Sequence, residues 1–334
     1  VSFPAGLATG DVNRVTMTGV TELDLSRNTA EQRFDMRLVG GAVSFEAPVG
    51  QLEMVLEVGE LELDVGSVSM AAELAARFEA NPVKIRATGS VGTGGAPLRI
   101  QTNEIDALST GGNLFVKVPT DVHVVRFQAG PDDTANLAST EGSIYLDAQS
   151  IVSGRNINLR APEGALFADS TAIIRGGNLK LDLGKGVGTA DAPLKTDIET
   201  LDVTTDGGDV LINEKDSVTL VGAGARIDSG AGKVALEAGG DIVMQPPAEL
   251  STTGGPVELK AAGDVGLSQI ASKNGPIRID SGGKIYDNTG GSGVTHLRTT
   301  STLTLNAVNG VGGYGSAQIR LDANTVDLYN STSG

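Results

Sequence analysis

The sequence predicts an all-β protein with the architecture of a right-handed parallel β-helix, a solenoid in which short strands stack coil upon coil. Three observations support this prediction. Apolar and polar residues alternate along many short segments, glycine accounts for 46 of the 334 residues, and one short unit recurs through most of the chain. Alternation at a period of two indicates half-buried strands, and frequent glycine indicates frequent turns.

The composition favours a thin aliphatic core. Hydrophobic residues make up 40% of the chain and charged residues 20%, which is enough apolar material for a packed interior. Aromatic residues make up only 3%, and Trp is absent, whereas a compact globule normally anchors its core with large rings. An elongated repeat domain fits better, because a solenoid does not depend on one spherical core.

The recurring unit is clearest in three copies. They read KVALEAGGDIV from Lys233, PVELKAAGDVG from Pro256 and PIRIDSGGKIY from Pro276. In each copy, alternating apolar residues precede a glycine-containing bend, and a further apolar residue follows the bend. Successive first strands are 20 to 26 residues apart and start at Val210, Val234, Val257, Ile277 and Leu303. Propeller blades need about 40 residues, so we interpret the unit as one coil of a β-helix.

A longer repeat lies over the first. One copy starts at Val91 and reads VGTGGAPLRIQTNEIDALSTGGNLFV, and a second starts at Val187 and reads VGTADAPLKTDIETLDVTTDGGDVLI; the two align without a gap. A degenerate third copy begins at Gly310. The block V-G-T-x-x-A-P-L-[RK], followed by L-D-V and G-G-D-V, resembles a unit of large bacterial exoproteins of the filamentous-haemagglutinin family. The resemblance runs from about Val83 to the end and is strongest at 186–209.

The resemblance implies a secreted, cell-surface protein. Members of that family are exported by two-partner secretion and form right-handed β-helical rods used in adhesion, biofilm and contact-dependent competition. Their secretion domain usually carries an Asn-Pro-Asn-Gly motif, which this chain lacks, since Asn81-Pro82 has no such continuation. The resemblance therefore predicts architecture and an extracellular location, and it leaves the export route open.

We expect one continuous β-helix segment over residues 1–334. Residues 1–80 are predicted to form less regular coils, and residues 81–334 regular coils that continue beyond the C-terminus.

One stretch departs from the strand pattern. Residues 70–80, MAAELAARFEA, are rich in Ala, Leu and Glu, which favour helix, and Leu74 and Phe78 would share one helical face. We therefore expect a short helical insertion near residues 70–80.

Charge and composition exclude several classes of partner. The formal net charge is −16, and nucleic acid and anionic lipid are bound by clustered Lys and Arg. Without Cys, the chain has neither disulfides nor thiolate ligands. No apolar run approaches the roughly 18 residues of a membrane span. We expect neither nucleic acid binding nor membrane spanning.

The sequence gives little support for an enzyme, although β-helices also carry polysaccharide lyases and glycoside hydrolases. Such sites need carboxylates and a basic residue at defined positions. Outward carboxylates are so frequent that we expect them to be solvated strand faces: Asp147, Asp182, Glu237, Glu258 and Asp280. The four tyrosines, at positions 145, 286, 314 and 329, are scattered. The two histidines, His123 and His296, cannot form a multi-histidine metal site, and His123 is expected on a strand. No catalytic residue is predicted.

Calcium is the one ion considered. The segments GGDI at 239–242 and AGDV at 262–265 contain a Gly-Asp step, but they lack the second Gly and the tandem spacing of calcium-binding β-rolls. Asp241 and Asp264 are thus weak candidates for metal ligands, and caps of turns are the favoured interpretation. No other cofactor is predicted.

The resulting hypothesis is a structural or adhesive segment of a secreted bacterial surface or matrix protein. Its expected partners are other copies of itself or cell-surface and matrix components. Neither end shows an obvious cap in the sequence, and unpaired strand edges at uncapped ends favour head-to-tail assembly into filaments. The alternatives are a polysaccharide lyase or glycoside hydrolase on the same fold, and a shaft that presents a toxin or receptor-binding domain.

Overall fold

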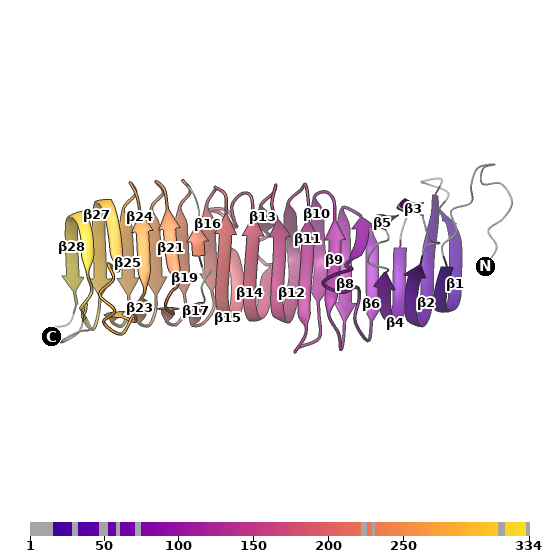
Figure 1. Cartoon of the computed structure of the whole chain (residues 1–334), viewed down its shortest axis with the longest axis horizontal. Helices are drawn as coiled ribbons and strands as arrows, with labels where there is room; N and C mark the ends of the chain where they lie inside the picture. The colour runs from indigo at the N-terminus through magenta and orange to yellow at the C-terminus, as the bar shows by residue number, and fades with distance from the viewer. Residues whose placement is uncertain are drawn as a thin grey trace.

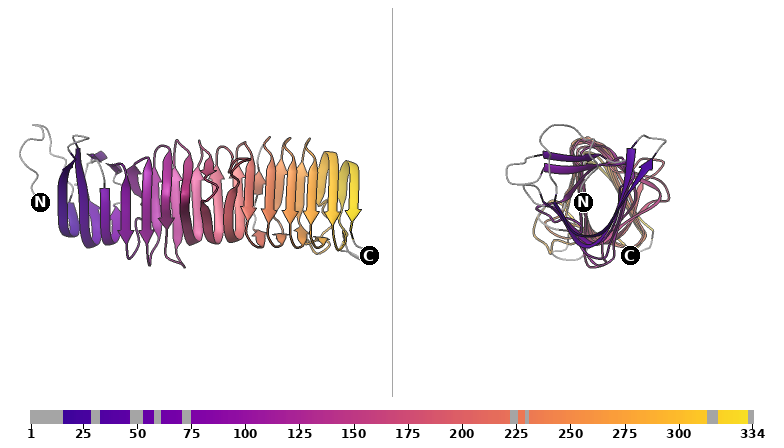
Figure 2. Two further views of the ribbon diagram at one scale, coloured as in Figure 1. Left: turned by 180° about the vertical axis from the view of Figure 1, so that it is seen from behind. Right: turned by 90° about the vertical axis from the view of Figure 1, so that its right-hand side faces the viewer.

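The computed structural model describes residues 16–28, 33–46, 53–57, 61–70, 75–221, 226–228, 231–312 and 318–331. These residues form 28 β-strands and no helix. Figure 1 shows the strands stacked along one long axis, with β1 at one end and β28 at the other. The end-on view in Figure 2 shows the coils superimposed around this axis. The predicted all-β, parallel solenoid is confirmed.

Most strands are short, and longer strands occur at both ends and in the middle of the molecule. The N-terminal strands are β1 (Thr16–Asn28), β2 (Arg33–Glu46), β3 (Glu53–Glu57), β4 (Leu61–Met70), β5 (Ala75–Glu79), β6 (Val83–Ala87), β7 (Leu98–Gln101), β8 (Glu104–Ser109) and β9 (Leu114–Val118). The central strands are β10 (Val122–Gln128), β11 (Thr134–Ser139), β12 (Ile144–Ala161), β13 (Leu166–Ala168), β14 (Ile173–Leu183), β15 (Leu194–Thr205), β16 (Val210–Glu214), β17 (Val218–Leu220) and β18 (Arg226–Asp228). The C-terminal strands are β19 (Val234–Ala238), β20 (Ile242–Met244), β21 (Glu249–Thr252), β22 (Val257–Ala261), β23 (Val265–Leu267), β24 (Gln269–Ser272), β25 (Ile277–Ser281), β26 (Ile285–Asp287), β27 (Leu297–Ala307) and β28 (Leu321–Asn330).

Strands one coil apart pair in parallel and in register. The sequence copies coincide: Val234 pairs with Val257, Val257 with Ile277, and Ile277 with Leu303. All four side chains are buried. Because like residues stack at matching positions, the alternation in each strand places one apolar set inside and one polar set outside over many coils.

One inward-facing column runs through almost the whole molecule. Its members pair from strand to strand in the order Leu38, Leu63, Ile85, Ala107, Phe127, Val152, Ile174, Thr196, Glu214, Ala238, Ala261, Ser281, Ala307 and Asn330. The core is therefore a continuous thin stack, as the composition predicts.

Glu214 is an unexpected member of this column, since it is only 4% exposed. Its carboxylate accepts hydrogen bonds from the Thr196 hydroxyl at 2.6 Å and from the backbone N–H groups of Ile198 at 3.3 Å and Asp216 at 3.1 Å. A buried carboxylate is tolerated when its oxygens are hydrogen-bonded in this way. Glu214 thus supplies acceptors to backbone groups where β15 gives way to the shorter β16.

The V-G-T-x-x-A-P-L block is a turn with defined geometry. In the second copy, Val187 forms β-bridges with both neighbouring coils, and Gly188 has a φ of 66°, which glycine adopts without strain. Thr189 and Ala192 then exchange backbone hydrogen bonds of 3.0 and 3.2 Å before β15 starts at Leu194. The first copy repeats these features at Val91, Gly92, Thr93, Ala96 and Leu98.

The N-terminal end starts with an antiparallel strand pair. β1 pairs antiparallel with β2, and β2 pairs parallel with β4, so a hairpin strand lies beside the first parallel ladder. The outer edge at this end is formed by β1, which runs opposite to the strands of the parallel ladder. In the described residues no strand pairs with the other edge of β1, so the expectation that this end carries no cap stays a prediction.

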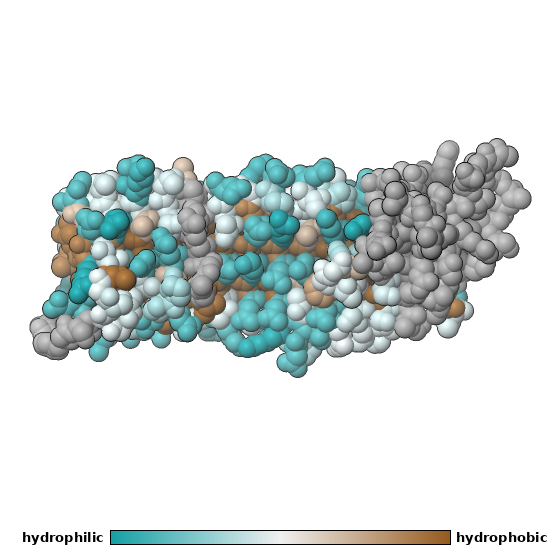
Figure 3. Space-filling view, in the orientation of Figure 1, coloured by the Kyte–Doolittle hydropathy of each residue, from teal (hydrophilic) through white to brown (hydrophobic). Residues whose placement is uncertain are grey.

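β28 is the last strand of the ladder that the structure describes. Leu321, Val326 and Leu328 of β28 continue inward-facing columns, and their partners in β27 are completely buried. With no coil above them in the described part of the chain, these three side chains are 37%, 39% and 58% exposed. Figure 3 shows this apolar patch as brown atoms at the left-hand end.

The helical insertion expected near residues 70–80 is wrong where the structure describes this stretch. Met70 ends β4, and residues 75–79 form β5, which pairs in parallel with β3 and with β7. The ladder of backbone hydrogen bonds overrides the helix propensity of Ala and Glu, as tertiary context often does. Leu74 lies outside the described residues.

Candidate functional site

The outward carboxylates lie on strand faces, and all five singled out from the sequence have a partner. Asp147 contacts His123, Asp182 contacts Arg160, Glu237 contacts Lys260, Glu258 contacts Lys233, and Asp280 contacts Arg278. Four of these pairs join neighbouring coils and one joins residues of the same strand. Opposite charges across strands stabilise a sheet modestly, so these contacts support the stack.

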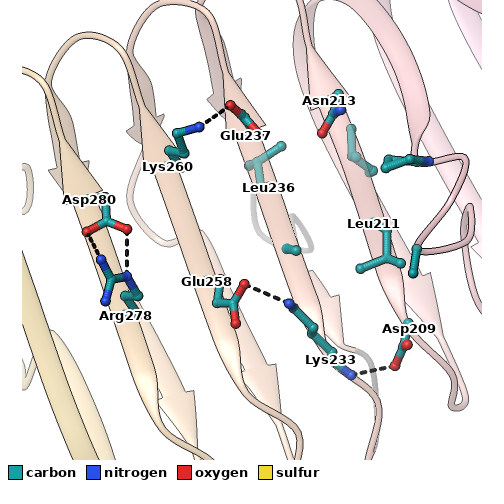
Figure 4. Close-up of a pocket in the computed structure, with 14 residues that line it drawn as sticks. Asp209, Leu211, Asn213, Lys233, Leu236, Glu237, Glu258, Lys260, Arg278 and Asp280 are labelled. Carbon is teal, nitrogen blue, oxygen red and sulfur yellow. Dashed lines mark hydrogen bonds and ion pairs between the residues drawn. The ribbon is translucent and has the colours of Figure 1, made fainter.

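The largest such group surrounds an open groove of about 380 Å³ on β16, β19, β22 and β25. Figure 4 shows Lys260 directed at Glu237 and Lys233 directed at Glu258 across neighbouring strands, with Arg278 and Asp280 paired on one strand. Leu211 faces outward but is only 7% exposed, and Ala190 and Pro193 of the preceding turn also line the groove. The V-G-T turn therefore forms one wall of this groove.

Three ion pairs lie in the groove, and a fourth carboxylate, Asp209, binds the backbone. Lys233 Nζ lies 2.6 Å from Glu258 Oε2, and Asp209 Oδ1 accepts a hydrogen bond of 2.8 Å from the Lys233 backbone N–H. The hydrogen bond to Glu237 raises the pKa of Lys260, and the hydrogen bonds to Asp280 raise the pKa of Arg278. The groove presents ion pairs, whereas general acid–base catalysis needs a group that exchanges its proton near the working pH.

A second charged cluster, which the sequence analysis missed, links three coils. Asp106 of β8 lies between Arg86 of β6 and Arg126 of β10. Arg126 makes two hydrogen bonds with it, of 2.8 and 3.2 Å. Burial alone would raise the pKa of Asp106, but the hydrogen bonds from Arg126 and Arg86 lower it. A carboxylate held by two guanidinium groups is a strong structural clamp.

Asp241 and Asp264 cap turns. Asp241 Oδ1 accepts a hydrogen bond of 2.7 Å from the backbone N–H of Asp264, and Asp264 Oδ1 accepts one of 2.7 Å from that of Lys284. In the same way, the Ser217 hydroxyl oxygen accepts a hydrogen bond of 2.8 Å from the backbone N–H of Asp241. Among the described residues, no group of three or more His, Cys, Asp or Glu side chains could hold a metal ion. At these turns, each carboxylate accepts a backbone N–H of the next coil, so the hydrogen bonding between coils continues where no backbone carbonyl accepts it.

A buried polar cluster lies between β26 and β27. His296 is 1% exposed; its Nε2 lies 2.8 Å from Asp287 Oδ1, and its Nδ1 accepts the Arg320 backbone N–H at 3.1 Å. These contacts define the neutral ring with its proton on Nε2. The Thr289 N–H and hydroxyl both donate to Asp287 Oδ1 at 2.6 Å. Burial would raise the pKa of Asp287, but the hydrogen bonds from Thr289 and His296 lower it to about 2.

Three rings, missed by the sequence analysis, form a stack on the outer face. His123 lies on β10, a strand as predicted, and pairs in register with Tyr145, which pairs with Phe167. The His123 and Tyr145 ring centroids are 4.8 Å apart, and those of Tyr145 and Phe167 are 5.1 Å apart. Each ring follows a buried apolar residue that starts a strand pairing: Val122, Ile144 and Leu166. The position of each ring, directly after an inward-facing apolar residue, was the feature of the sequence that could have predicted the stack.

No family model, curated protein or solved structure matches this chain. Its function must therefore be inferred from its own residues. No helix in the described ranges has the length and hydropathy required to cross a membrane.

Proposed function

We propose that this chain is a structural and adhesive segment of a secreted bacterial surface or matrix protein, and that it has no catalytic activity. The continuous inward column from Leu38 to Asn330 is the observation that carries the proposal. A core of this form gives each coil the same neighbours, so length can increase without a change in local packing. A stack of such coils is suited to span a distance and to expose its outer faces to binding partners.

Two further features support an exposed, extended role. The resemblance of the V-G-T-x-x-A-P-L block to filamentous-haemagglutinin repeats favours an extracellular location, and the net charge of −16 favours solubility at the cell surface. Six of the outer charged side chains in the Figure 4 groove form three ion pairs, which suits a rigid shaft.

The open face of β28 favours contact with a second copy. β1 runs antiparallel to β2, so head-to-tail stacking would place β28 of one molecule against β1 of the next as an antiparallel pair. Such pairing would cover Leu321, Val326 and Leu328 and would satisfy unpaired backbone groups at both edges. We propose this end-to-end contact as the route to filaments.

Electron microscopy of the native material tests the structural role directly. We expect straight, unbranched rods or fibres of constant width. Compact particles with a lateral cleft, or release of reducing ends from polysaccharides by the purified chain, would contradict the proposal.

A further inference from the structure

The ring stack borders a hollow that differs from the charged groove of Figure 4. Its volume is about 270 Å³, and its lining runs along two adjacent coils, over residues 145–148 and 167–169. Tyr145 and Asp147 lie on one coil, and Phe167 and Asp169 lie on the next. Because side chains two positions apart on a strand share a face, each coil contributes one aromatic ring and one carboxylate to the same hollow.

The two carboxylates are held in place but keep acceptor capacity. Asp147 Oδ1 lies 2.8 Å from His123 Nδ1. Asp169 Oδ1 accepts the Thr171 N–H at 2.8 Å and the Thr171 hydroxyl at 2.6 Å, and these hydrogen bonds lower the pKa of Asp169. Within the described residues, neither carboxylate forms a salt bridge with Lys or Arg, in contrast to Glu237, Glu258 and Asp280. A carboxylate has about four acceptor sites, so both can accept further hydrogen bonds.

The backbone around the hollow is fixed. The Asp169 N–H donates to the Leu146 carbonyl at 2.8 Å, which ties the two coils together. Gln149 has a φ of 61°, and it is the single non-glycine residue with positive φ in the described ranges. Its N–H donates to the Thr171 hydroxyl at 2.8 Å. A strained non-glycine residue of this kind persists only where surrounding contacts hold it, and such residues cluster at binding sites.

We infer that this hollow binds an uncharged glycan. Sugar hydroxyls donate to carboxylates, so the free acceptor positions of Asp147 and Asp169 suit them, and the Tyr145 hydroxyl adds a donor and an acceptor. His123 and Phe167 stack on the two faces of the half-buried Tyr145 ring, so Tyr145 offers its edge and hydroxyl to the hollow, and the half-buried Phe167 ring supplies apolar contact for the C–H groups of a sugar. Two adjacent coils carry this pair of groups, Tyr145 with Asp147 and Phe167 with Asp169, which suits a short stretch of a sugar chain.

The charge pattern selects against acidic ligands. With two ionised carboxylates in the hollow and a net charge of −16, uronic or sulfated sugars are repelled. Lys195 is nearby, but its Nζ donates to the Ser170 carbonyl at 2.6 Å. The charges thus exclude acidic polysaccharides, and the hydroxyl groups of an uncharged polysaccharide match the acceptors of the hollow; this inference rests on the proposed adhesive function and gives that function a ligand.

Calorimetric titration of the full chain tests the inference. The probes are uncharged hexasaccharides of glucose, mannose, galactose and N-acetylglucosamine, compared with the acidic alginate and heparin hexasaccharides. We expect at least one uncharged probe to bind, and Asp169→Asn to weaken its binding about tenfold, the equivalent of one hydrogen bond to a charged group. Asn keeps an oxygen for the Thr171 hydrogen bonds, so the coil should stay folded. Tyr145→Phe, which keeps the ring stack, should weaken binding several-fold.

The matched controls are Asp280→Asn and Tyr329→Phe, which change an outward carboxylate and an exposed tyrosine elsewhere. Both should bind as the unmodified chain does. Absence of binding to every uncharged probe, equal binding by Asp169→Asn, or preference for a charged probe would overturn the inference. Electron microscopy reports the rod shape whether or not glycan binds. Failure of glycan binding is therefore distinguishable from failure of the structural role.

Discussion

Single residues at the corners of the coils decide how closely the coils approach. Gly255 is buried, and a methyl group at this position would overlap the backbone carbonyl of Gly232 in the coil below. Its neighbour Gly254 is exposed, and a methyl group there would meet no atom within 4 Å. The glycine-rich bends of the sequence thus contain two kinds of position, and only one of them requires glycine for packing.

The pair provides a matched test. We expect Gly255→Ala to lower the free energy of unfolding by about 1–3 kcal/mol, the usual cost of overpacking. Gly254→Ala should change it by less than about 0.5 kcal/mol, as at other open surface positions. Chemical denaturation of the two variants measures both values, and equal effects would show that the coils do not pack as closely as described.

The buried Asp287–His296 pair predicts a pH dependence at the same scale. The pKa of Asp287 is about 2 in the folded chain, below the ordinary value near 3.9 for an unfolded Asp. A depressed folded pKa means that the stabilisation is complete above about pH 4 and is lost as pH falls towards 2.

We expect Asp287→Asn to cost about 1.5–3 kcal/mol at pH 7, because hydrogen bonds to a buried charged acceptor are lost. The difference from the unmodified chain should shrink as pH falls from 4 to 2. Denaturation curves at several pH values measure this, with Asp280→Asn, at a half-buried carboxylate on the outer strand face, as the control. A difference that stays constant down to pH 2 would contradict the assigned role.

At the scale of single elements, the residue before a strand often has a side-chain oxygen that accepts a backbone hydrogen bond from the next coil. Asp241 and Asp264 precede β20 and β23 and accept backbone N–H groups from the next coil, and Asn113 does the same before β9 by accepting the Thr134 N–H at 2.8 Å. An oxygen acceptor is the shared requirement, and a negative charge is not.

Asp264→Asn should therefore leave stability nearly unchanged, whereas Asp264→Ala should cost about 1 kcal/mol by leaving the Lys284 N–H without its acceptor. The thermal midpoint of the unmodified chain should not respond to a calcium chelator or to added calcium. A rise in the midpoint with calcium that Asp264→Asn abolishes would instead establish a metal site.

Elements were predictable where the signal lay within one coil. Alternation in KVALEAGGDIV, PVELKAAGDVG and PIRIDSGGKIY gave the strands and the in-register pairing of Val234, Val257 and Ile277. β5 was missed because its Ala and Glu residues favour helix locally, while its pairing with β3 and β7 is set by distant segments.

The candidate sites were less predictable than the strands. Asp106 lies between Arg86 and Arg126, and the His123, Tyr145 and Phe167 rings come together from three coils. Residue types alone do not show such contacts, because they depend on the register between coils. The buried Glu214 was hidden for the same reason, since a charged residue in a strand is normally read as outward-facing.

At the scale of the whole molecule, the two ends are unlike. β1 is an antiparallel addition to the first ladder, and β28 is a parallel edge with exposed apolar side chains. An assembly that joins unlike ends is heterologous and grows in one dimension, whereas like ends would give closed dimers. The net charge of −16 opposes association at low ionic strength, and salt screens this repulsion.

Self-association should therefore be strongest at high protein concentration and moderate salt, and it should depend on β28. Leu328→Lys places a charge on a side chain that is 58% exposed at the open end, and should hold the chain in its monomeric state. Val125→Lys changes a side chain of β10 that is 42% exposed on the outer face, far from both ends, and should associate as the unmodified chain does. Light scattering after size-exclusion chromatography separates the outcomes: equal suppression by both variants would indicate a lateral contact, and monomers at every concentration would remove end-to-end assembly from the proposed function.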